Sequence, residues 1–192
     1  MATRLPLQQT QILAKLCSRN EGKLRELRAL LPGWELELLG AKEYPPEEGE
    51  TYYDNARAKA RFGRTVEPEA WMLGEDSGIE VAGLDGGPGV ESARFGGANP
   101  VATLLEALQD VEDRRARYVC ELVNLSPDEL EFRGTGFLEG RIVDEPRGSE
   151  GFGFDPIFVP QGENRTVAEL GNEWKRANSH RARAARALLE RL

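Results

Sequence analysis

The sequence predicts an α/β fold with a mixed, twisted sheet and flanking helices. Strand-like runs alternate with helical patterns: the apolar run 12–17 precedes leucines at helical spacing, and 34–38 alternates apolar and polar residues. Two further strand-like segments, 118–125 and 130–136, are joined by a Ser-Pro-Asp-Glu turn. These two segments are expected to form a hairpin, and the sheet as a whole is expected to be mixed.

The length of 192 residues fits one domain, predicted over 11–192, after a loose extension at 1–10 that has no periodicity. The net charge of −8 disfavours nonspecific binding to nucleic acid, although a small polyanion could still enter a locally basic cleft. No membrane span or signal peptide is apparent, which predicts a cytoplasmic protein. Cys17 and Cys120 lie in apolar runs and are predicted to be buried thiols.

The first strand leads into a turn, Ser18 to Lys23, and then a helix that ends at Pro32-Gly33. Such a turn presents backbone N–H groups and the positive end of a helix to an anion. Asn20 adds a side-chain donor and Lys23 a mobile charge. The spacing is not that of a P-loop, and an ordinary capped helix with a solvated Lys23 remains the alternative.

The next elements are a half-exposed strand at 34–38, a loop at 40–50 and a helix from about 52 to 64. Thr51 and Asp54 predict a capping box at the start of this helix. The run 71–73 predicts a short strand, and Glu75 and Asp76 follow it directly. Carboxylates at the end of a strand suit a hard cation such as Mg²⁺, whereas the alternative is a plain acidic turn.

A turn at 84–89 and the sequence Ser92-Ala93-Arg94 follow the acidic stretch, and Asn99-Pro100 predicts the start of a helix to about 108. The segment 146–156 is rich in glycine and aromatic residues. Phe152 and Phe154 could stack on a base, and Asp155 could accept from its N–H groups. The alternative is a glycine-rich turn with two core aromatics.

Near the end of the chain, Thr166 and Glu169 predict a capping box, and Ser179 predicts the start of the last helix. His180, the only histidine, falls at that helix start, where an imidazolium is disfavoured. The neighbouring arginines other than Arg181 are predicted to form a solvated helix face.

Four motifs occur in one order: Ser18-Arg19-Asn20-Glu21-Gly22-Lys23, Glu75-Asp76-Ser77-Gly78, Gly151-Phe152-Gly153-Phe154-Asp155-Pro156 and Ser179-His180-Arg181. Together they resemble the Ham1/RdgB/ITPase family of inosine/xanthosine triphosphate pyrophosphatases, over about 12–192. The resemblance implies two lobes around a deep cleft and usually a homodimer. It also implies cleavage of deaminated purine nucleoside triphosphates (ITP, dITP, XTP) between the α- and β-phosphates, which removes them from the nucleotide pool.

The resemblance further implies roles for individual residues. Asp76 would be the general base and would hold Mg²⁺ together with a loop glutamate, for which the spacing favours Glu47 over Glu48. Triphosphate binding would fall to Ser18, Arg19, Asn20, Glu21, Gly22, Lys23 and Ser77. Base binding would fall to Phe152, Gly153, Phe154, Asp155, Lys175, His180 and Arg181. Two positions depart from the family pattern, because Glu75 replaces an aspartate and Phe154 a tyrosine.

Arg181 has only donors, so it is expected to favour the 6-oxo group of hypoxanthine over the 6-amino group of adenine. Two alternatives remain at this stage. A Maf-type nucleotide pyrophosphatase should lack both the Ser-His-Arg sequence and the Gly-Phe-Gly-Phe-Asp sequence. A non-enzymatic nucleotide-binding protein would keep the pocket without turnover.

Overall fold

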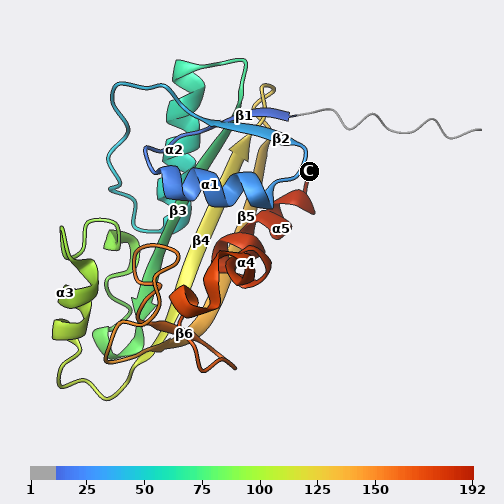
Figure 1. Cartoon of the computed structure of the whole chain (residues 1–192). Helices are drawn as coiled ribbons and strands as arrows, with labels where there is room; N and C mark the ends of the chain where they lie inside the picture. Colours follow the sequence, from blue (N-terminus) through green and yellow to red (C-terminus); the bar gives the residue numbers. More distant parts are fainter. Residues whose placement is uncertain (1–11) are drawn as a thin grey trace, which may run out of the picture.

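A computed structural model describes residues 12–192 (Figure 1); the predicted extension 1–10 lies outside them. Six strands form one sheet in the order β2-β1-β3-β4-β5-β6. They are β1 (Ile12–Leu16), β2 (Trp34–Leu38), β3 (Trp71–Val81), β4 (Arg115–Leu125), β5 (Glu131–Ile142) and β6 (Phe158–Pro160). β1 pairs in parallel with β2 and β3, whereas β3 to β6 pair antiparallel. The predicted mixed sheet is confirmed.

The α-helices in residues 12–192 begin at the predicted N-caps, except the first, whose cap Asn20 was predicted as a side-chain donor to an anion. They are α1 (Glu21–Leu30), α2 (Tyr52–Val66), α3 (Pro100–Ala107), α4 (Val167–Asn178) and α5 (His180–Leu189). Their N-caps are Asn20, Thr51, Asn99, Thr166 and Ser179, and each side chain accepts a backbone N–H bond of the first turn. No helix within residues 12–192 is long and apolar enough to cross a bilayer.

The acidic stretch is the main departure from the predicted elements. Instead of ending at Leu73, β3 continues through Glu75 and Asp76 to Val81, in register with β4 along ten residue pairs. β1, in contrast, pairs with β3 only at Trp71–Leu73. The two acids therefore lie within a strand, just beyond the point where the pairing with β1 stops.

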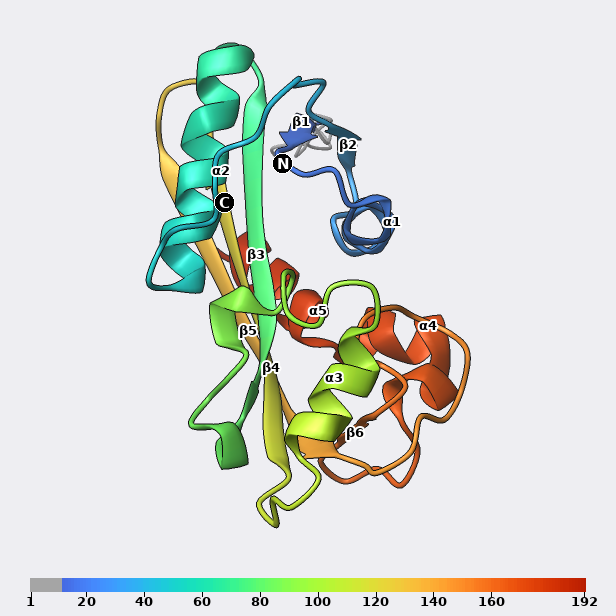
Figure 2. The same ribbon diagram turned by 90° about the vertical axis from the view of Figure 1, so that its left-hand side faces the viewer.

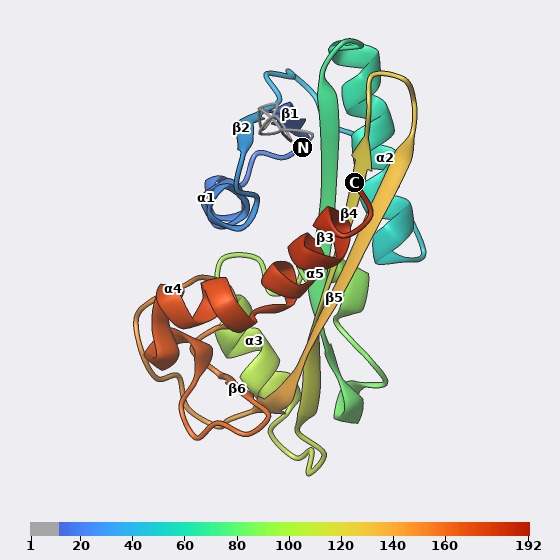
Figure 3. The same cartoon turned by 90° about the vertical axis from the view of Figure 1, so that its right-hand side faces the viewer.

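The helices cover both faces of the sheet and build two lobes on the long strands β3, β4 and β5 (Figures 2 and 3). α1 and α5 cover one face and α2 the other. One lobe contains β1, β2, α1 and α2, and the other contains α3, β6 and α4. Cys17 and Cys120 are buried and free, as predicted.

Glycines permit the close packing of helices on the sheet. A Cβ on Gly136 of β5 would lie 2.0 Å from the carbonyl oxygen of His180 in α5. A Cβ on Gly74 of β3 would lie 1.9 Å from the carbonyl oxygen of Ala56 in α2. Both helices thus approach the sheet to a distance that only glycine allows.

Candidate active site

Two adjoining cavities share part of their lining, and residues of β3 line the first. The first, of about 230 Å³, is lined by Ser77, Tyr118, Phe152, Asp155, His180 and Arg181, among others. The second, of about 720 Å³, is lined by the turn from Cys17 to Lys23 together with Tyr44, Glu47 and Lys59. Asn20, Lys23 and Ala93 line both. The cavities therefore form one cleft with two compartments.

Glu75 and Asp76 point to opposite faces of the sheet, because successive side chains alternate along a strand. Glu75 faces α1 and α5, where it contacts Lys23 and Arg181. Asp76 faces α2, where it contacts Lys59. The adjacent acids thus belong to two different charge networks.

Asp76 accepts from Lys59 Nζ at 2.8 Å and from Asn55 Nδ2 at 3.2 Å. Both donors stand on one face of α2, four residues apart. The Lys59 ammonium also pairs with the loop residue Glu47, so two carboxylates converge on one cation. Burial raises the pKa of Asp76 above its ordinary value of 3.8, although Lys59 opposes the change. A carboxylate with a raised pKa suits a general base.

Glu75 is completely buried between two cations. Its carboxylate lies 2.6 Å from Lys23 Nζ and 2.9 Å from Arg181 Nη2. Burial alone would raise the pKa of Glu75, but Lys23 and Arg181 outweigh it and hold that pKa well below its ordinary value. Glu75 therefore stays ionised and links Lys23 of α1 to Arg181 of α5, both of which line the first cavity.

Glu26 of α1, a half-buried acid, connects the two lobes. Its carboxylate pairs with Lys175 of α4 and with Arg181 of α5. Lys175 Nζ also lies 2.7 Å from Asp155 Oδ2. Arg181 donates in addition to Ser77 Oγ at 2.9 Å. Most of the Arg181 donors are thus already engaged within the protein.

Aromatic rings line the first cavity. Lys175 Nζ lies 4.5 Å from the Phe152 ring centroid, and the Arg181 guanidinium carbon lies 5.6 Å from it. Phe154 lines the cavity and also packs in the core of its lobe. Burial and the neighbouring Arg181 and Lys175 hold the pKa of His180 well below its ordinary value, so the imidazole is neutral. This compartment has the flat walls and mixed polar edges that suit a base.

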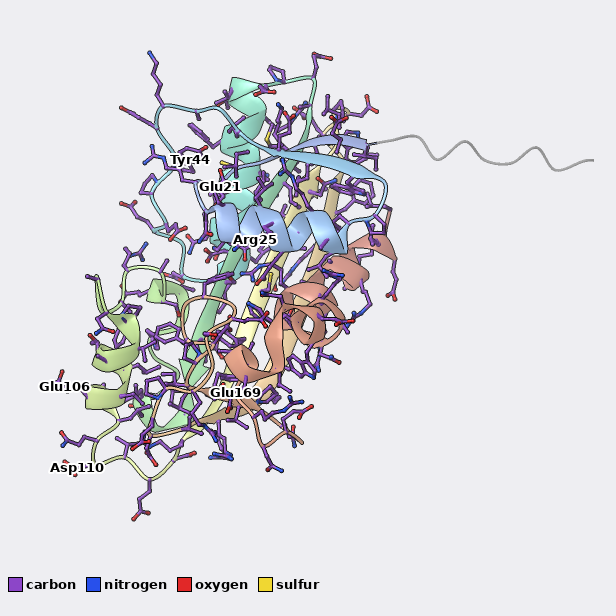
Figure 4. The ribbon with its side chains drawn as sticks, viewed as in Figure 1. Glu21, Arg25, Tyr44, Glu106, Asp110 and Glu169 are labelled. Atoms are coloured by element: carbon purple, nitrogen blue, oxygen red, sulfur yellow. The ribbon has the colours of Figure 1, made fainter. Side chains whose placement is uncertain are left out.

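The second cavity opens at the N-terminal end of α1, where Figure 4 labels Glu21 and Tyr44. Ser18 Oγ accepts the Asn20 N–H at 3.1 Å, and Asn20 in turn caps the helix through Lys23 N–H. Arg19 stands over the Tyr44 ring, with 4.8 Å between its guanidinium carbon and the ring centroid. This arrangement gathers positive charge and N–H groups, which suits phosphate oxygens.

All of the predicted site residues except Asp76 line the two cavities, and Asp76 contacts Lys59 of the cleft wall. The structure adds four neighbours that sequence reasoning did not assign to the site. Asn55 and Lys59 could have been found from their i, i+4 spacing on one helix face. Glu26 and Tyr118 carry no local signal, because their partners are distant in sequence. Glu48, the alternative to Glu47, is exposed, whereas Glu47 lines the cleft.

Comparison with known proteins agrees with this geometry. The Ham1 family model matches residues 14–191, which is nearly the whole described chain. The chain belongs to the Ham1 family.

Two relatives of this Ham1-family chain illustrate the similarity. The dITP/XTP pyrophosphatase of Bdellovibrio bacteriovorus is 40% identical over 190 residues, covering 92% of this chain and 96% of the relative. The dITP/XTP pyrophosphatase of Deinococcus radiodurans is 43% identical over 180 residues, covering 91% and 90%. The similarity therefore spans both compartments of the cleft.

Solved Ham1 structures share the fold. The Ham1 protein of Staphylococcus aureus superposes with a TM-score of 0.82 at 32% identity, covering 93% of this chain and 96% of that one. A dITP/XTP pyrophosphatase from Mycobacterium abscessus gives a TM-score of 0.74 at 41% identity, covering 93% and 99%. The predicted ITPase-like α/β architecture is thus confirmed.

Proposed function

We propose that this chain hydrolyses deaminated purine nucleoside triphosphates (ITP, dITP and XTP) to the monophosphate and pyrophosphate. The observation that supports this most directly is the contact of Asp76, a buried carboxylate with a raised pKa, with Lys59 in the cleft wall. The names of the relatives, dITP/XTP pyrophosphatases, support the substrate class.

In this proposal, different residues transfer the proton, bind the triphosphate and bind the base. Asp76 takes the proton of the attacking water. Lys23, the backbone N–H groups of Arg19, Glu21 and Gly22, and Ser77 bind the triphosphate and offset the charge that develops on it. Phe152 and Phe154 flank the base, while Asp155, Lys175, His180 and Arg181 contact its edge. In this scheme, Arg19, Glu21, Gly22 and Gly153 shape the walls of the two compartments.

The donor set fits a divalent cation. Among residues 12–192, no cluster of three or more His, Cys, Asp or Glu is arranged as a complete metal site. Mg²⁺, however, is typically held by one or two carboxylates and takes its other ligands from substrate phosphates and water. Asp76 and Glu47 would hold it, since both already converge on the Lys59 ammonium. When bound, it would mask phosphate charge and acidify a bound water.

A panel of nucleoside triphosphates, assayed for pyrophosphate release with and without Mg²⁺, tests this function. ITP, dITP and XTP should be cleaved far faster than ATP or GTP, and only with the metal present. Release of orthophosphate in place of pyrophosphate would contradict the proposed bond cleavage. Nucleotide binding without turnover would favour a non-enzymatic nucleotide sensor.

A further inference from the structure

Tyr118 is a buried tyrosine in the wall of the cavity to which the proposed function assigns the base. It stands on β4 and is 7% exposed. Its hydroxyl donates to Asp155 Oδ1 at 3.3 Å. Its ring lies against the His180 imidazole, with centroids 4.6 Å apart and planes inclined by 11°. One side chain thus contacts two of the polar residues that line the cavity.

The two oxygens of Asp155 differ in their partners. Oδ2 accepts from Phe152 N–H at 2.9 Å and from Lys175 Nζ at 2.7 Å. Within residues 12–192, Oδ1 accepts its hydrogen bond from the Tyr118 hydroxyl. A carboxylate oxygen can accept about two hydrogen bonds, so Oδ1 keeps an acceptor position for a ligand. The Tyr118 hydroxyl fixes the direction in which that position points.

The imidazole ring of His180 is held in place by stacking on the Tyr118 ring. Its Nδ1 is buried and has no hydrogen-bond partner within the described chain, so no bond at that atom fixes the ring plane. Tyr118 covers one face of the imidazole, and Phe158 supports Tyr118 in turn, with ring centroids 4.6 Å apart. The plane of the imidazole therefore follows the plane of the Tyr118 ring.

We propose that Tyr118 is a positioning residue for base recognition. Its hydroxyl aims the free acceptor of Asp155 at an N–H of the base, and its ring holds the His180 imidazole in the orientation that meets the base edge. The ligand is a 6-oxopurine, whose N1 carries a proton that adenine lacks. This inference rests on the proposed function and adds a residue that the four sequence motifs do not contain.

The substitution Tyr118→Phe removes the hydroxyl and keeps the ring. KM for ITP should rise about three- to tenfold, the loss typical of one hydrogen bond, while kcat stays unchanged. ATP should be affected less, because its N1 has no proton to offer Asp155. Tyr53→Phe is the matched control, since it removes a hydroxyl that contacts Glu131 outside the cleft.

The substitution Tyr118→Leu removes the ring as well. His180 is the only histidine in the chain, so its imidazole protons give an unambiguous NMR signal. In wild type and in Tyr118→Phe this signal should be shifted upfield by the stacked ring. In Tyr118→Leu it should move downfield, and KM for ITP should rise further than in Tyr118→Phe.

An unchanged KM in Tyr118→Phe, or a fall in kcat at constant KM, would overturn the role of the hydroxyl. An unchanged histidine signal in Tyr118→Leu would overturn the role of the ring. Binding of inosine monophosphate, measured by calorimetry, separates this inference from the proposed function. If wild type binds but does not cleave ITP, the hydrolytic function fails, whereas weaker binding by Tyr118→Phe still supports the inference.

Discussion

At the scale of single residues, the contrast between Asp76 and Glu75 governs the chemistry of the cleft. The two are neighbours in sequence, yet burial leaves the pKa of Asp76 raised in spite of Lys59, while Lys23 and Arg181 leave that of Glu75 lowered. The Asp76 carboxylate is thus suited to proton exchange, whereas the Glu75 carboxylate serves as a fixed charge. Two substitutions test this division.

The substitution Asp76→Asn should reduce pyrophosphate release by about 10²–10⁴-fold, the range typical of a lost general base. The wild-type rate should fall on acidification through a pKa above 3.8, because the base must be ionised. Steady-state assays over a range of pH check both. Asp128→Asn, in the exposed β4–β5 turn, is the matched control. A folded Asp76→Asn variant that keeps more than about a tenth of the activity contradicts the assignment.

The substitution Glu75→Gln should destabilise the fold by about 3–5 kcal/mol, because it leaves buried cations without their partner. The folded-state pKa of Glu75 is lowered, so its contribution is complete above the ordinary value of 4.5 and is lost as pH falls below it. The difference in unfolding free energy between wild type and Glu75→Gln should therefore be constant above that pH and shrink below it.

Urea titrations at several pH values measure that difference. Glu75→Asp keeps the charge and is expected to lower the free energy of unfolding less than Glu75→Gln does, which makes it the comparison variant. A difference that grows on acidification would show that Glu75 is not held ionised by Lys23 and Arg181.

At the scale of elements, helix starts could be predicted because their signals are local. Thr166, for instance, caps α4 through the N–H of a residue three positions away. The extent of β3 could not be predicted, since glycines and acids are poor strand formers. Its conformation is imposed by pairing with β4 and by α2 packed on Gly74. Tertiary contacts here override local preference.

The site, like the fold, could be predicted only where its signals are local in sequence. Motifs made of consecutive residues, such as 18–23 and 151–156, indicated the residues that line the cleft. The pairing of Arg181 with Glu75 joins residues 106 positions apart, and no local pattern encodes it. Sequence reasoning therefore predicted donors at Arg181 that are free for the base, whereas most of them bond to the protein.

The substitution Gly136→Ala tests how β5 positions α5. Its Cβ would meet the His180 carbonyl oxygen at 2.0 Å and Ala184 N at 2.4 Å, so the start of α5 must shift. We expect a lower melting temperature and a higher KM for ITP, since His180 and Arg181 move with the helix. Gly40→Ala, with nothing within 4 Å of the added Cβ, is the control and should be neutral. An unchanged KM would show that α5 can move without disturbing the site.

At the scale of the whole molecule, the chain has a net charge of −8, whereas its cleft is lined by the cations Lys23, Lys59 and Arg19. A small triphosphate can reach these cations in the cleft, whereas an extended polyanion would be repelled by the net negative charge of the chain. KM for ITP should rise with ionic strength, because salt screens the attraction between exposed charges. A short single-stranded oligonucleotide should show no binding by fluorescence anisotropy at physiological salt. Tight oligonucleotide binding would contradict this view.

The alternation of side chains along β3 also bears on how such a protein can evolve. Ser77 and Glu75, which contact Arg181, lie on one face of the strand. Asp76, the proposed general base, lies on the other face and pairs with Lys59 of α2. Because the two sets of side chains lie on opposite faces, a lineage could change its purine preference by substitutions on one face while Asp76 and Lys59 are inherited unchanged.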